Sequence, residues 1–262
     1  MKTLQTIPDV RRELADAGRI GLVPTMGAFH EGHLALFRAA REDSEAVVAS
    51  LFINPAQFVA NEDLTSYPRD EARDAKLAKA AGIDILFAPS VEEMYPDGYA
   101  TWVDVEDTGA EGSARPTHFR GVATVCLKLF NIVRPQVAYF GQKDAQQAAV
   151  LRRMIRDLDL DLVLRVVPTV RDVDGLALSS RNAYLSEQDR NQALALPRAL
   201  EAGRSAYAEG ADPVAAARGA LNGLVPEYVE LLDLDGVTLL ATAARVGSTR
   251  LIDNIVLEGD LK

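Results

Sequence analysis

The sequence of 262 residues has one cysteine and no run of eighteen apolar residues. A single cysteine excludes an internal disulfide and fits a reducing compartment. Because Cys126 lies in the apolar stretch 122–127, we interpret it as a buried small side chain and not as a nucleophile. The residues after Met1 include no apolar leader, and we therefore expect neither secretion nor a membrane span, but a cytoplasmic protein.

Basic residues are also few, with 28 Lys and Arg against 38 Asp and Glu, which gives a formal net charge of -10. Such a charge disfavours non-specific binding to nucleic acid or to anionic membranes, although local basic patches stay possible. We expect small-molecule substrates, no nucleic acid and no membrane. Histidine is rarer still, and two of the three histidines, His30 and His33, stand three residues apart.

What the chain does have is an alternation of apolar runs with segments of helical period, which is typical of a parallel α/β sheet. We predict a Rossmann-like parallel-sheet domain over residues 1–172 and a smaller C-terminal α+β domain over residues 173–262. The expected strands of the first domain are 20–23, 47–53, 83–88, 137–140 and 162–167, and its expected helices are 34–42, 69–81, 122–133 and 146–158.

After Asp174 and Gly175 the sequence becomes rich in alanine. In the smaller domain we predict helices at 187–208 and 213–224 and strands at 229–234 and 251–256.

In the first domain, residues 101–106 alternate with period two, which predicts an edge strand with one buried face that could form a subunit contact.

The segment 24–33 carries the strongest motif. Pro24 and Gly27 end the first strand, and an amphipathic stretch follows His33, so the motif is predicted on a strand-to-helix turn. Free backbone N–H groups and the positive end of the helix dipole suit a triphosphate there. His30 and His33 can face one side and donate hydrogen bonds to phosphate oxygens, while Gly32 allows close approach to the backbone.

Two other interpretations of the histidines stay open. They could ligate a metal ion, although their spacing is not the four-residue separation of a zinc-protease helix and the sequence has no cysteine cluster. They could also be ordinary surface histidines.

Polar residues follow three further predicted strands. Gln57 comes after the strand that Pro55 ends, and Lys143 follows residues 137–140 as a mobile cation beside Asp144, which could simply cap a helix. Ser179, Ser180 and Arg181 form a compact donor set for phosphate, or a solvated loop before a helix. The cationic segment 115–121 could hold a carboxylate or coat a loop.

Taken in order, these segments resemble the pantothenate synthetase (pantoate–β-alanine ligase) family of HIGH-type nucleotidyl transferases. Residues 26–33 resemble its version of the HIGH motif, and residues 178–182 resemble its counterpart of the KMSKS loop. The resemblance also takes in 54–58, 67–69, 115–121 and 140–144, and so spans about residues 20–185. Departures are Phe29 in place of leucine and the small Ala56 and Ala145, which bear on pocket shape.

The resemblance implies an enzyme with two half-reactions. The carboxylate of pantoate attacks the α-phosphorus of ATP to give pantoyl adenylate and pyrophosphate, and the amine of β-alanine then displaces AMP. ATP is a substrate, Mg²⁺ accompanies its phosphates, and a homodimer is expected. A protein base is not required in the first step, so the site must supply alignment and charge neutralisation.

The resemblance also assigns residues. The catalytic group comprises His30, His33, Lys143 and Arg181. The ATP-binding group comprises Met26, Gly27, Ala28, Phe29, His30, Glu31, Gly32, His33, Gly141, Gln142, Lys143, Asp144, Val170, Leu178, Ser179, Ser180 and Arg181. The group for pantoate and β-alanine comprises Met26, Gln57, Phe58 and Gln147, and Asp74 is a candidate near the magnesium.

Three alternatives remain at this point. Another nucleotidyl transferase could pass AMP to a phosphate and would not need the region of Gln57 and Gln147. An aminoacyl-tRNA synthetase fits less well, because the chain is short and acidic and shows no anticodon-binding module. A non-catalytic adenine-nucleotide sensor could retain the fold without the activity.

Overall fold

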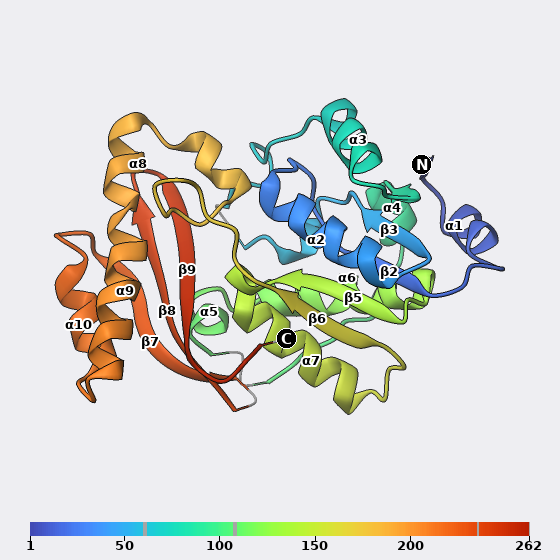
Figure 1. Cartoon of the computed structure of the whole chain (residues 1–262). Coiled ribbons are helices and arrows are strands. Elements are labelled where there is room, and N and C mark those ends of the chain that lie inside the picture. The colour runs from blue at the N-terminus through green and yellow to red at the C-terminus, as the bar shows by residue number, and fades with distance from the viewer. Residues whose placement is uncertain (60–61, 107–108, 235, 262) are drawn as a thin grey trace. The chain divides into compact units, whose positions relative to one another are not determined.

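The computed structural model describes residues 1–59, 62–106, 109–234 and 236–261 (Figure 1). The chain divides into two compact units, each described here by itself. The first unit comprises Met1–Phe140 and Val150–Val167, and the second comprises Gly141–Ala149 and Pro168–Lys262. The nine residues Gly141–Ala149 thus belong to the second unit, although the chain then returns to the first unit. A domain boundary between residues 172 and 173 stays a prediction.

A six-stranded sheet with the order β1-β4-β3-β2-β5-β6 forms the centre of the first unit. The neighbours β1 and β4, β4 and β3, β3 and β2, and β2 and β5 pair in parallel, which confirms the predicted parallel α/β architecture. All four residues of β2 are buried, as expected for a parallel strand covered on both faces. The strands are β1 (Lys2–Leu4), β2 (Ile20–Val23), β3 (Ala46–Ser50), β4 (Ile85–Phe87), β5 (Val137–Gly141) and β6 (Val163–Val167).

The helices that connect these strands bury apolar stripes against the sheet. Phe29 and Phe37 pack with strand residues such as Val47 and Tyr139 in one cluster. The helices and 3-10 turns are α1 (Ile7–Glu13), α2 (Glu31–Asp43), η1 (Pro55–Gln57), α3 (Glu71–Ala80), α4 (Val91–Met94), α5 (Gly109–Ala114), α6 (His118–Val133), η2 (Gln142–Asp144) and α7 (Ala145–Asp157). Helix α7 begins in residues of the second unit.

Helix α6 is buried over most of its length, as its apolar sequence predicts. Cys126 lies within it and is a free, buried cysteine. Burial raises the pKa of its thiol to about 12, so the thiolate that a nucleophile needs does not form near neutral pH.

The predicted edge strand at residues 101–106 is wrong, because this segment has no regular secondary structure. Its contacts are a ring contact of Trp102 with aromatic side chains and a backbone hydrogen bond to α6, and not those of a strand. The Trp102 ring stacks on Tyr95 with centroids 6.2 Å apart and meets Tyr99 edge-on at 5.5 Å. The backbone N–H of Val103 donates to Thr124 Oγ1 of α6 at 3.0 Å. A subunit contact at this segment stays a prediction.

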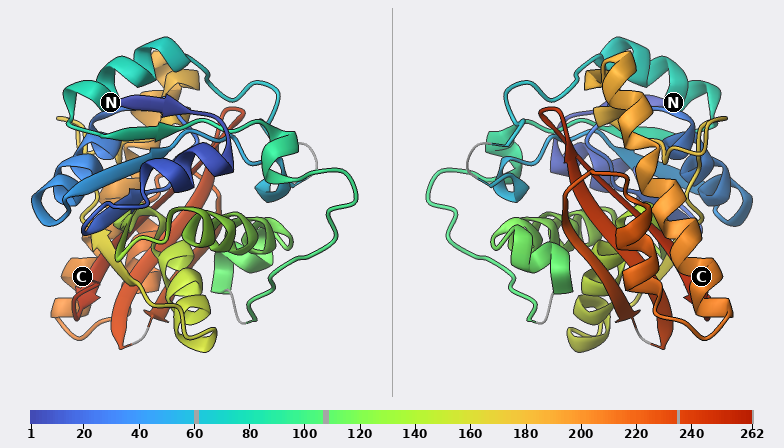
Figure 2. Two further views of the ribbon diagram at one scale, coloured as in Figure 1. Left: turned by 90° about the vertical axis from the view of Figure 1, so that its right-hand side faces the viewer. Right: turned by 90° about the vertical axis from the view of Figure 1, so that its left-hand side faces the viewer.

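The second unit contains an antiparallel meander of β7 (Pro226–Leu234), β8 (Val237–Val246) and β9 (Thr249–Glu258), drawn orange to red in Figure 2. The predicted strands 229–234 and 251–256 are confirmed, and β8 between them was not predicted. Helices α8 (Glu187–Ala193), α9 (Ala195–Ala208) and α10 (Pro213–Ala220) complete the unit with the 3-10 helix η3 (Ser180–Tyr184).

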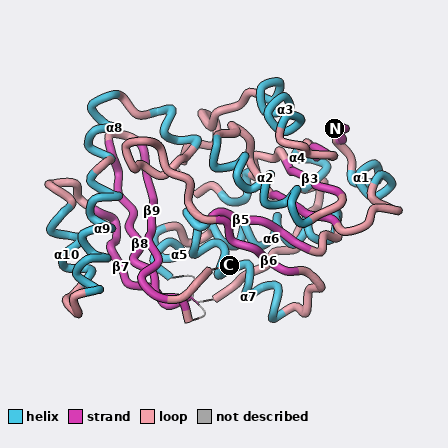
Figure 3. The backbone as a smooth tube through the Cα atoms, in the orientation of Figure 1, coloured by secondary structure: helices cyan, strands magenta, loops and turns pink. Residues whose placement is uncertain are grey.

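The single helix predicted at 187–208 is broken at Leu194 into α8 and α9 (Figure 3). Leu196 and Leu200 of α9 pack with Leu240 of β8 and Leu251 of β9, which makes this sheet and its helices one hydrophobic core. In the described ranges no helix reaches the length and apolarity that crossing a membrane requires.

Candidate active site

The two histidines lie where the motif predicted them, on the turn between β2 and α2, which we call the histidine turn (residues 24–33). His30 is the N-cap of α2, and its Nδ1 accepts a hydrogen bond from Gly32 N at 3.1 Å. The Nδ1 of His33 accepts from His30 N at 3.3 Å, which completes a reciprocal capping box. Because both Nδ1 atoms are acceptors, both neutral rings carry their proton on Nε2. The ring centroids are 4.2 Å apart, so the two rings are direct neighbours on the turn.

The backbone of this turn is held by Asp74 of α3, a carboxylate that is 1% exposed. Its Oδ2 accepts from Ala28 N at 2.7 Å and its Oδ1 from Phe29 N at 2.8 Å. Ala28 has a φ of 53° and Gly27 a φ of 91°, so the turn contains two successive left-handed residues. A Cβ at Gly27 would lie 2.6 Å from Leu51 Cδ1, so space and conformation both require glycine there.

A metal site made by protein side chains alone does not form in the described residues, since no group of three His, Cys, Asp or Glu side chains is placed to hold an ion. Both oxygens of Asp74 already accept backbone N–H groups. The observed contacts of Asp74 are therefore those of a carboxylate that supports the histidine turn, and its place near magnesium stays a prediction.

Gln57 and Met26, predicted to contact pantoate, are in contact with each other. Gln57 Nε2 donates to the Sδ of Met26 at 3.2 Å, and Asn54 Nδ2 donates to Gln57 Oε1 at 3.0 Å. Phe58 packs edge-on against Tyr67 with ring centroids 6.0 Å apart. Since Met26 belongs to the histidine turn, these contacts join the predicted substrate side chain to the predicted nucleotide-binding segment within one unit.

Asn54 fixes the start of η1. It is 1% exposed, and its amide uses all four of its hydrogen-bonding positions. Its Nδ2 donates to Gln57 Oε1 and to Gly121 O, and its Oδ1 accepts from Ala56 N at 3.3 Å and from Tyr95 OH at 2.8 Å. The side chain of Gln57 is therefore oriented by Asn54, whose own conformation is fixed by four hydrogen bonds.

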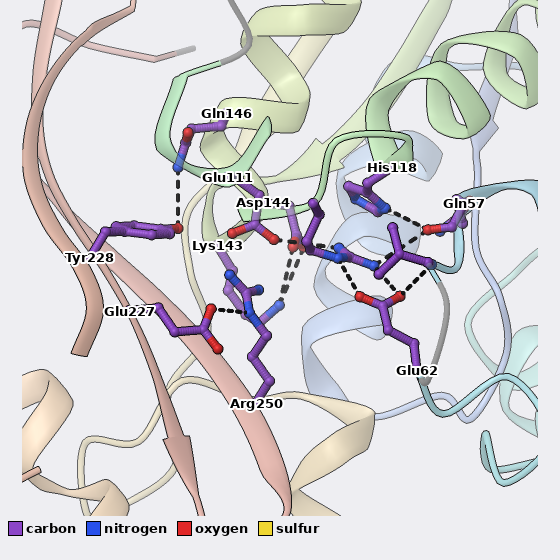
Figure 4. Close-up of polar contacts among 12 residues, drawn as sticks. Gln57, Glu62, Glu111, His118, Lys143, Asp144, Gln146, Glu227, Tyr228 and Arg250 are labelled. Carbon is purple, nitrogen blue, oxygen red and sulfur yellow. Dashed lines mark hydrogen bonds and ion pairs between the residues drawn. The ribbon is translucent and has the colours of Figure 1, made fainter. Parts of the chain in front are cut away.

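The carbonyl of Gln57 is held from the other side by α6 and the loop before it (Figure 4). His118 Nδ1 lies 2.8 Å from Gln57 O, which requires the Nδ1–H form of this ring. Burial lowers the pKa of His118 to about 4, and the nearby Arg115 guanidinium contributes to this lowering, so the ring is neutral at pH 7. His118 thus acts as a neutral donor to the backbone of η1, which we call the predicted substrate-binding turn because it carries Gln57.

Arg115 bonds protein carboxylates, so the segment 115–121 does more than coat a loop. Its guanidinium contacts Glu62 through Nε at 2.6 Å and Nη2 at 2.7 Å, and contacts Glu111 at 3.4 Å. Burial would raise the pKa of Glu62, but the hydrogen bonds and charge of Arg115 outweigh it and hold this pKa below its ordinary value. Sequence motifs did not point to Glu62, because its contact with Arg115 joins residues 53 positions apart, whereas Glu111 had a signal in its four-residue spacing from Arg115.

In the second unit, η2 carries the predicted phosphate-binding Lys143. Its Nζ lies 3.3 Å from Asp144 Oδ1, and the two side chains form an ion pair that remains partly open to solvent (Figure 4). Gly141 and Gln142 precede them directly, and Gln147 is half-buried on α7. Its neighbour Gln146 is buried and donates through Nε2 to Tyr228 OH at 3.3 Å.

The remaining predicted ATP-binding residues lie on a small hairpin and the turn after it. Val170 and Leu178 are brought together, because Leu178 N donates to Val170 O at 3.0 Å. Ser179 caps η3 by accepting from Arg181 N at 3.3 Å. Ser180 and Arg181 follow in the first turn and are half-buried. The loop is thus ordered by its own hydrogen bonds and is not merely solvated.

The whole chain is similar to known proteins of one kind. A family model described as pantoate-beta-alanine ligase matches residues 1–256. The pantothenate synthetase of Moorella thermoacetica is 52% identical, with 98% of this chain and 99% of the relative covered. That of Chloroflexus aurantiacus is 48% identical and covers 100% of both chains.

Solved structures give the same result. The crystal structure of pantothenate synthetase from Thermus thermophilus has a TM-score of 0.94 at 44% identity, with 99% of this chain and 100% of that chain covered. A pantoate-beta-alanine ligase from Francisella tularensis, described as complexed with Beta-gamma ATP and Beta-alanine, has a TM-score of 0.86 at 31% identity over 100% of both chains. This chain therefore belongs to the pantoate–β-alanine ligase family and is an enzyme of that family.

Proposed function

We propose that this enzyme condenses pantoate with β-alanine in an ATP-dependent reaction that passes through pantoyl adenylate. Family membership supports the overall ligation. The observation that carries the adenylate step is the histidine turn, on which backbone N–H groups bond both Nδ1 atoms and so orient the rings of His30 and His33. Donors fixed in advance suit charge that develops on phosphate oxygens in the transition state.

The first half-reaction needs no protein base, since the carboxylate of pantoate is already ionised. Its oxygen attacks the α-phosphorus of ATP, the bond to the β-phosphate oxygen breaks, and pyrophosphate leaves. His30, His33, Lys143, Ser180 and Arg181 are proposed to neutralise the phosphates. Mg²⁺ is proposed as part of the ATP substrate complex, bound through the phosphates and water.

The second half-reaction joins the two substrates. The neutral amine of β-alanine attacks the acyl carbon of the adenylate, the bond from that carbon to the phosphate oxygen breaks, and AMP leaves while the nitrogen releases one proton. Gln57 and Gln147 are proposed to hold pantoate by hydrogen bonds, with Met26 and Phe58 against its methyl groups. The contacts of Gln57 with Asn54 and Met26 support this assignment, because they orient a polar group beside apolar surface.

A half-reaction assay tests the proposal. Enzyme, ATP, Mg²⁺ and pantoate are mixed with and without β-alanine, and pyrophosphate and AMP are followed. We expect pyrophosphate in step with adenylate when β-alanine is absent, and pyrophosphate in step with AMP only when β-alanine is present. AMP release without β-alanine, or pyrophosphate release that does not depend on pantoate, would contradict the scheme. A product in which AMP is joined to a phosphate would identify the other transferase class.

Variants test the residue roles in the same assay. His33→Ala and Lys143→Ala should each slow pyrophosphate release by roughly a hundredfold or more, the scale of a lost oxyanion donor. Normal rates in both would show that the assignments are wrong.

We also propose a cytoplasmic homodimer. The single cysteine supports a reducing compartment. Light scattering after size-exclusion chromatography tests the dimer, and a mass equal to one chain would contradict it.

A further inference from the structure

Strand β9 carries two adjacent buried polar residues, Asp253 and Asn254, each 3% exposed. They lie in the part of the chain for which the sequence offered no motif. Buried polar side chains are costly unless they are fully hydrogen-bonded, so their partners define what they do. These partners belong to the two segments of the second unit that carry the predicted phosphate-binding residues.

Asn254 holds the first of these segments, η2. Its Nδ2 donates to Gln142 O at 2.9 Å and to Lys143 O at 3.0 Å, and its Oδ1 accepts from Gln142 Nε2 at 3.4 Å. One amide thus fixes the peptide groups on both sides of the Lys143 Cα. Because the lysine side chain is a flexible stem with a point charge at its end, this main-chain anchor limits the volume that the ammonium group can reach.

Asp253 holds the second segment through Arg171. The guanidinium donates to both carboxylate oxygens, through Nη1 at 2.7 Å and Nη2 at 3.0 Å. Arg171 also donates to Gly175 O at 3.1 Å and to Asn254 O at 3.3 Å. Arg171 and Ala177 pair in an antiparallel bridge, so this ion pair fixes the base of the hairpin that leads to Ser179.

The two anchors are directly connected, since the backbone N–H of Asn254 donates to Asp253 Oδ1 at 2.8 Å. We infer that Asp253 and Asn254 are positioning residues for ATP, which hold the η2 segment and the hairpin of residues 170–178 on one strand. This inference rests on the proposed function and adds to it two residues that lie far from Lys143 along the chain and act through other residues. A bidentate arginine pair and an amide that makes three hydrogen bonds to one segment are suited to such a role because both have fixed geometry.

Three variants separate this role from a general loss of stability. Asn254→Ala removes the anchor of η2, and Asn254→Asp keeps the size but turns an acceptor oxygen toward the two carbonyl groups. Arg171→Lys keeps the ion pair but loses the fork, and it serves as the milder variant if Asn254→Ala does not fold. Leu200→Ala is the matched control, because it weakens the core of the same unit without removing a hydrogen bond.

We expect Asn254→Ala and Asn254→Asp to raise the KM for ATP at least tenfold or to lower kcat at least tenfold in pyrophosphate release, with the KM for pantoate changed less than twofold. Arg171→Lys should show a smaller change of the same kind. Hydrogen exchange at residues 142–145 should quicken in the Asn254 variants and not in Leu200→Ala. The inference is overturned if the Asn254 variants keep the wild-type KM for ATP, kcat and hydrogen exchange, or if the KM values for ATP and for pantoate rise equally. It is also overturned if Leu200→Ala shows the same kinetic and exchange changes as the Asn254 variants.

The wild-type enzyme in the same assay keeps this test distinct from that of the proposed function. If the wild type releases no pyrophosphate with pantoate, the proposed function fails. The inference is then decided by calorimetric binding of ATP to the wild type and to Asn254→Ala. At least tenfold weaker binding to the variant upholds it, and equal binding overturns it.

Discussion

Replacement of Asp74 by alanine should destabilise the first unit by about 3 kcal/mol. The carboxylate is buried and accepts two backbone N–H groups, from Ala28 and Phe29. A hydrogen bond to a charged group contributes roughly 1.5–3 kcal/mol, and two of them would give about 3–6 kcal/mol. Removal of a buried charge recovers part of its desolvation cost, so the lower end of this range is expected. Total stabilities of domains are about 5–15 kcal/mol, and the loss is therefore measurable.

Asp74→Asn gives the sharper comparison. The amide keeps the shape and one acceptor, but its NH₂ group would face the N–H of Ala28 or of Phe29, so one bond is lost and a donor meets a donor. We expect a loss that approaches that of the alanine variant. Urea unfolding followed by tryptophan emission reports on this unit, since Trp102 is the only tryptophan in the sequence.

A loss below about 1 kcal/mol in Asp74→Ala would refute the role of Asp74 as the support of the histidine turn, because it is less than one such bond contributes. A magnesium titration of Asp74→Asn decides between this role and the predicted metal contact. Support of the turn predicts a raised KM for ATP and an unchanged requirement for free Mg²⁺. A requirement for Mg²⁺ that rises far more than the KM for ATP would favour the metal contact.

Three further predictions concern the predicted substrate-binding turn. The pKa of His118 is lowered to about 4 by burial, so its contribution to stability is complete above pH 6.5 and is lost as the pH falls toward 4, by about 3 kcal/mol in total. His118→Gln should remove this part of the pH dependence in urea unfolding, and identical pH slopes would contradict it. A Cβ at Gly121 would lie 2.2 Å from Ala56 O, so Gly121→Ala should lower the free energy of unfolding by about 1–3 kcal/mol and raise the KM for pantoate. The control is Gly219→Ala on α10, where a Cβ meets no atom within 4 Å and the free energy of unfolding should stay the same or rise. Gln57→Ala should raise the KM for pantoate far more than that for ATP, and equal effects would show that Gln57 is misassigned.

The central sheet could be predicted from the sequence because most of its strands lie in short apolar runs, which segments of helical period separate. Strand β1 was not predicted because its sequence, Lys-Thr-Leu, contains only one apolar residue. The break at Leu194 had a signal, since Pro197 is the third residue of α9, within the first turn, where a backbone N–H has no partner inside the helix and its absence is tolerated. Residues 101–106 misled because a period of two in the sequence does not by itself provide a neighbouring strand, and this segment contacts Tyr95, Tyr99 and α6 instead.

The residues proposed to contact substrates were easier to select than those that hold them. Polar side chains at strand ends are visible as local patterns, and this is how His30, Lys143 and Gln57 were selected. Asn254 and Glu62 act on segments 111 and 53 residues away, as the hydrogen bonds of Asn254 to Lys143 and of Glu62 to Arg115 show. Contacts of such separation depend on the folded arrangement and leave no spacing in the sequence.

The saturated amide of Asn54 limits how this enzyme could change its acid substrate. Each of its four hydrogen bonds is made to a different residue, so a replacement at position 54 leaves several polar groups without a hydrogen-bond partner at once. Selection for a new acid would then retain Asn54 and Gly121 as a fixed pair and vary the side chains around them. A library directed at Met26 and Phe58 should contain more folded variants with altered acid preference than one directed at Asn54.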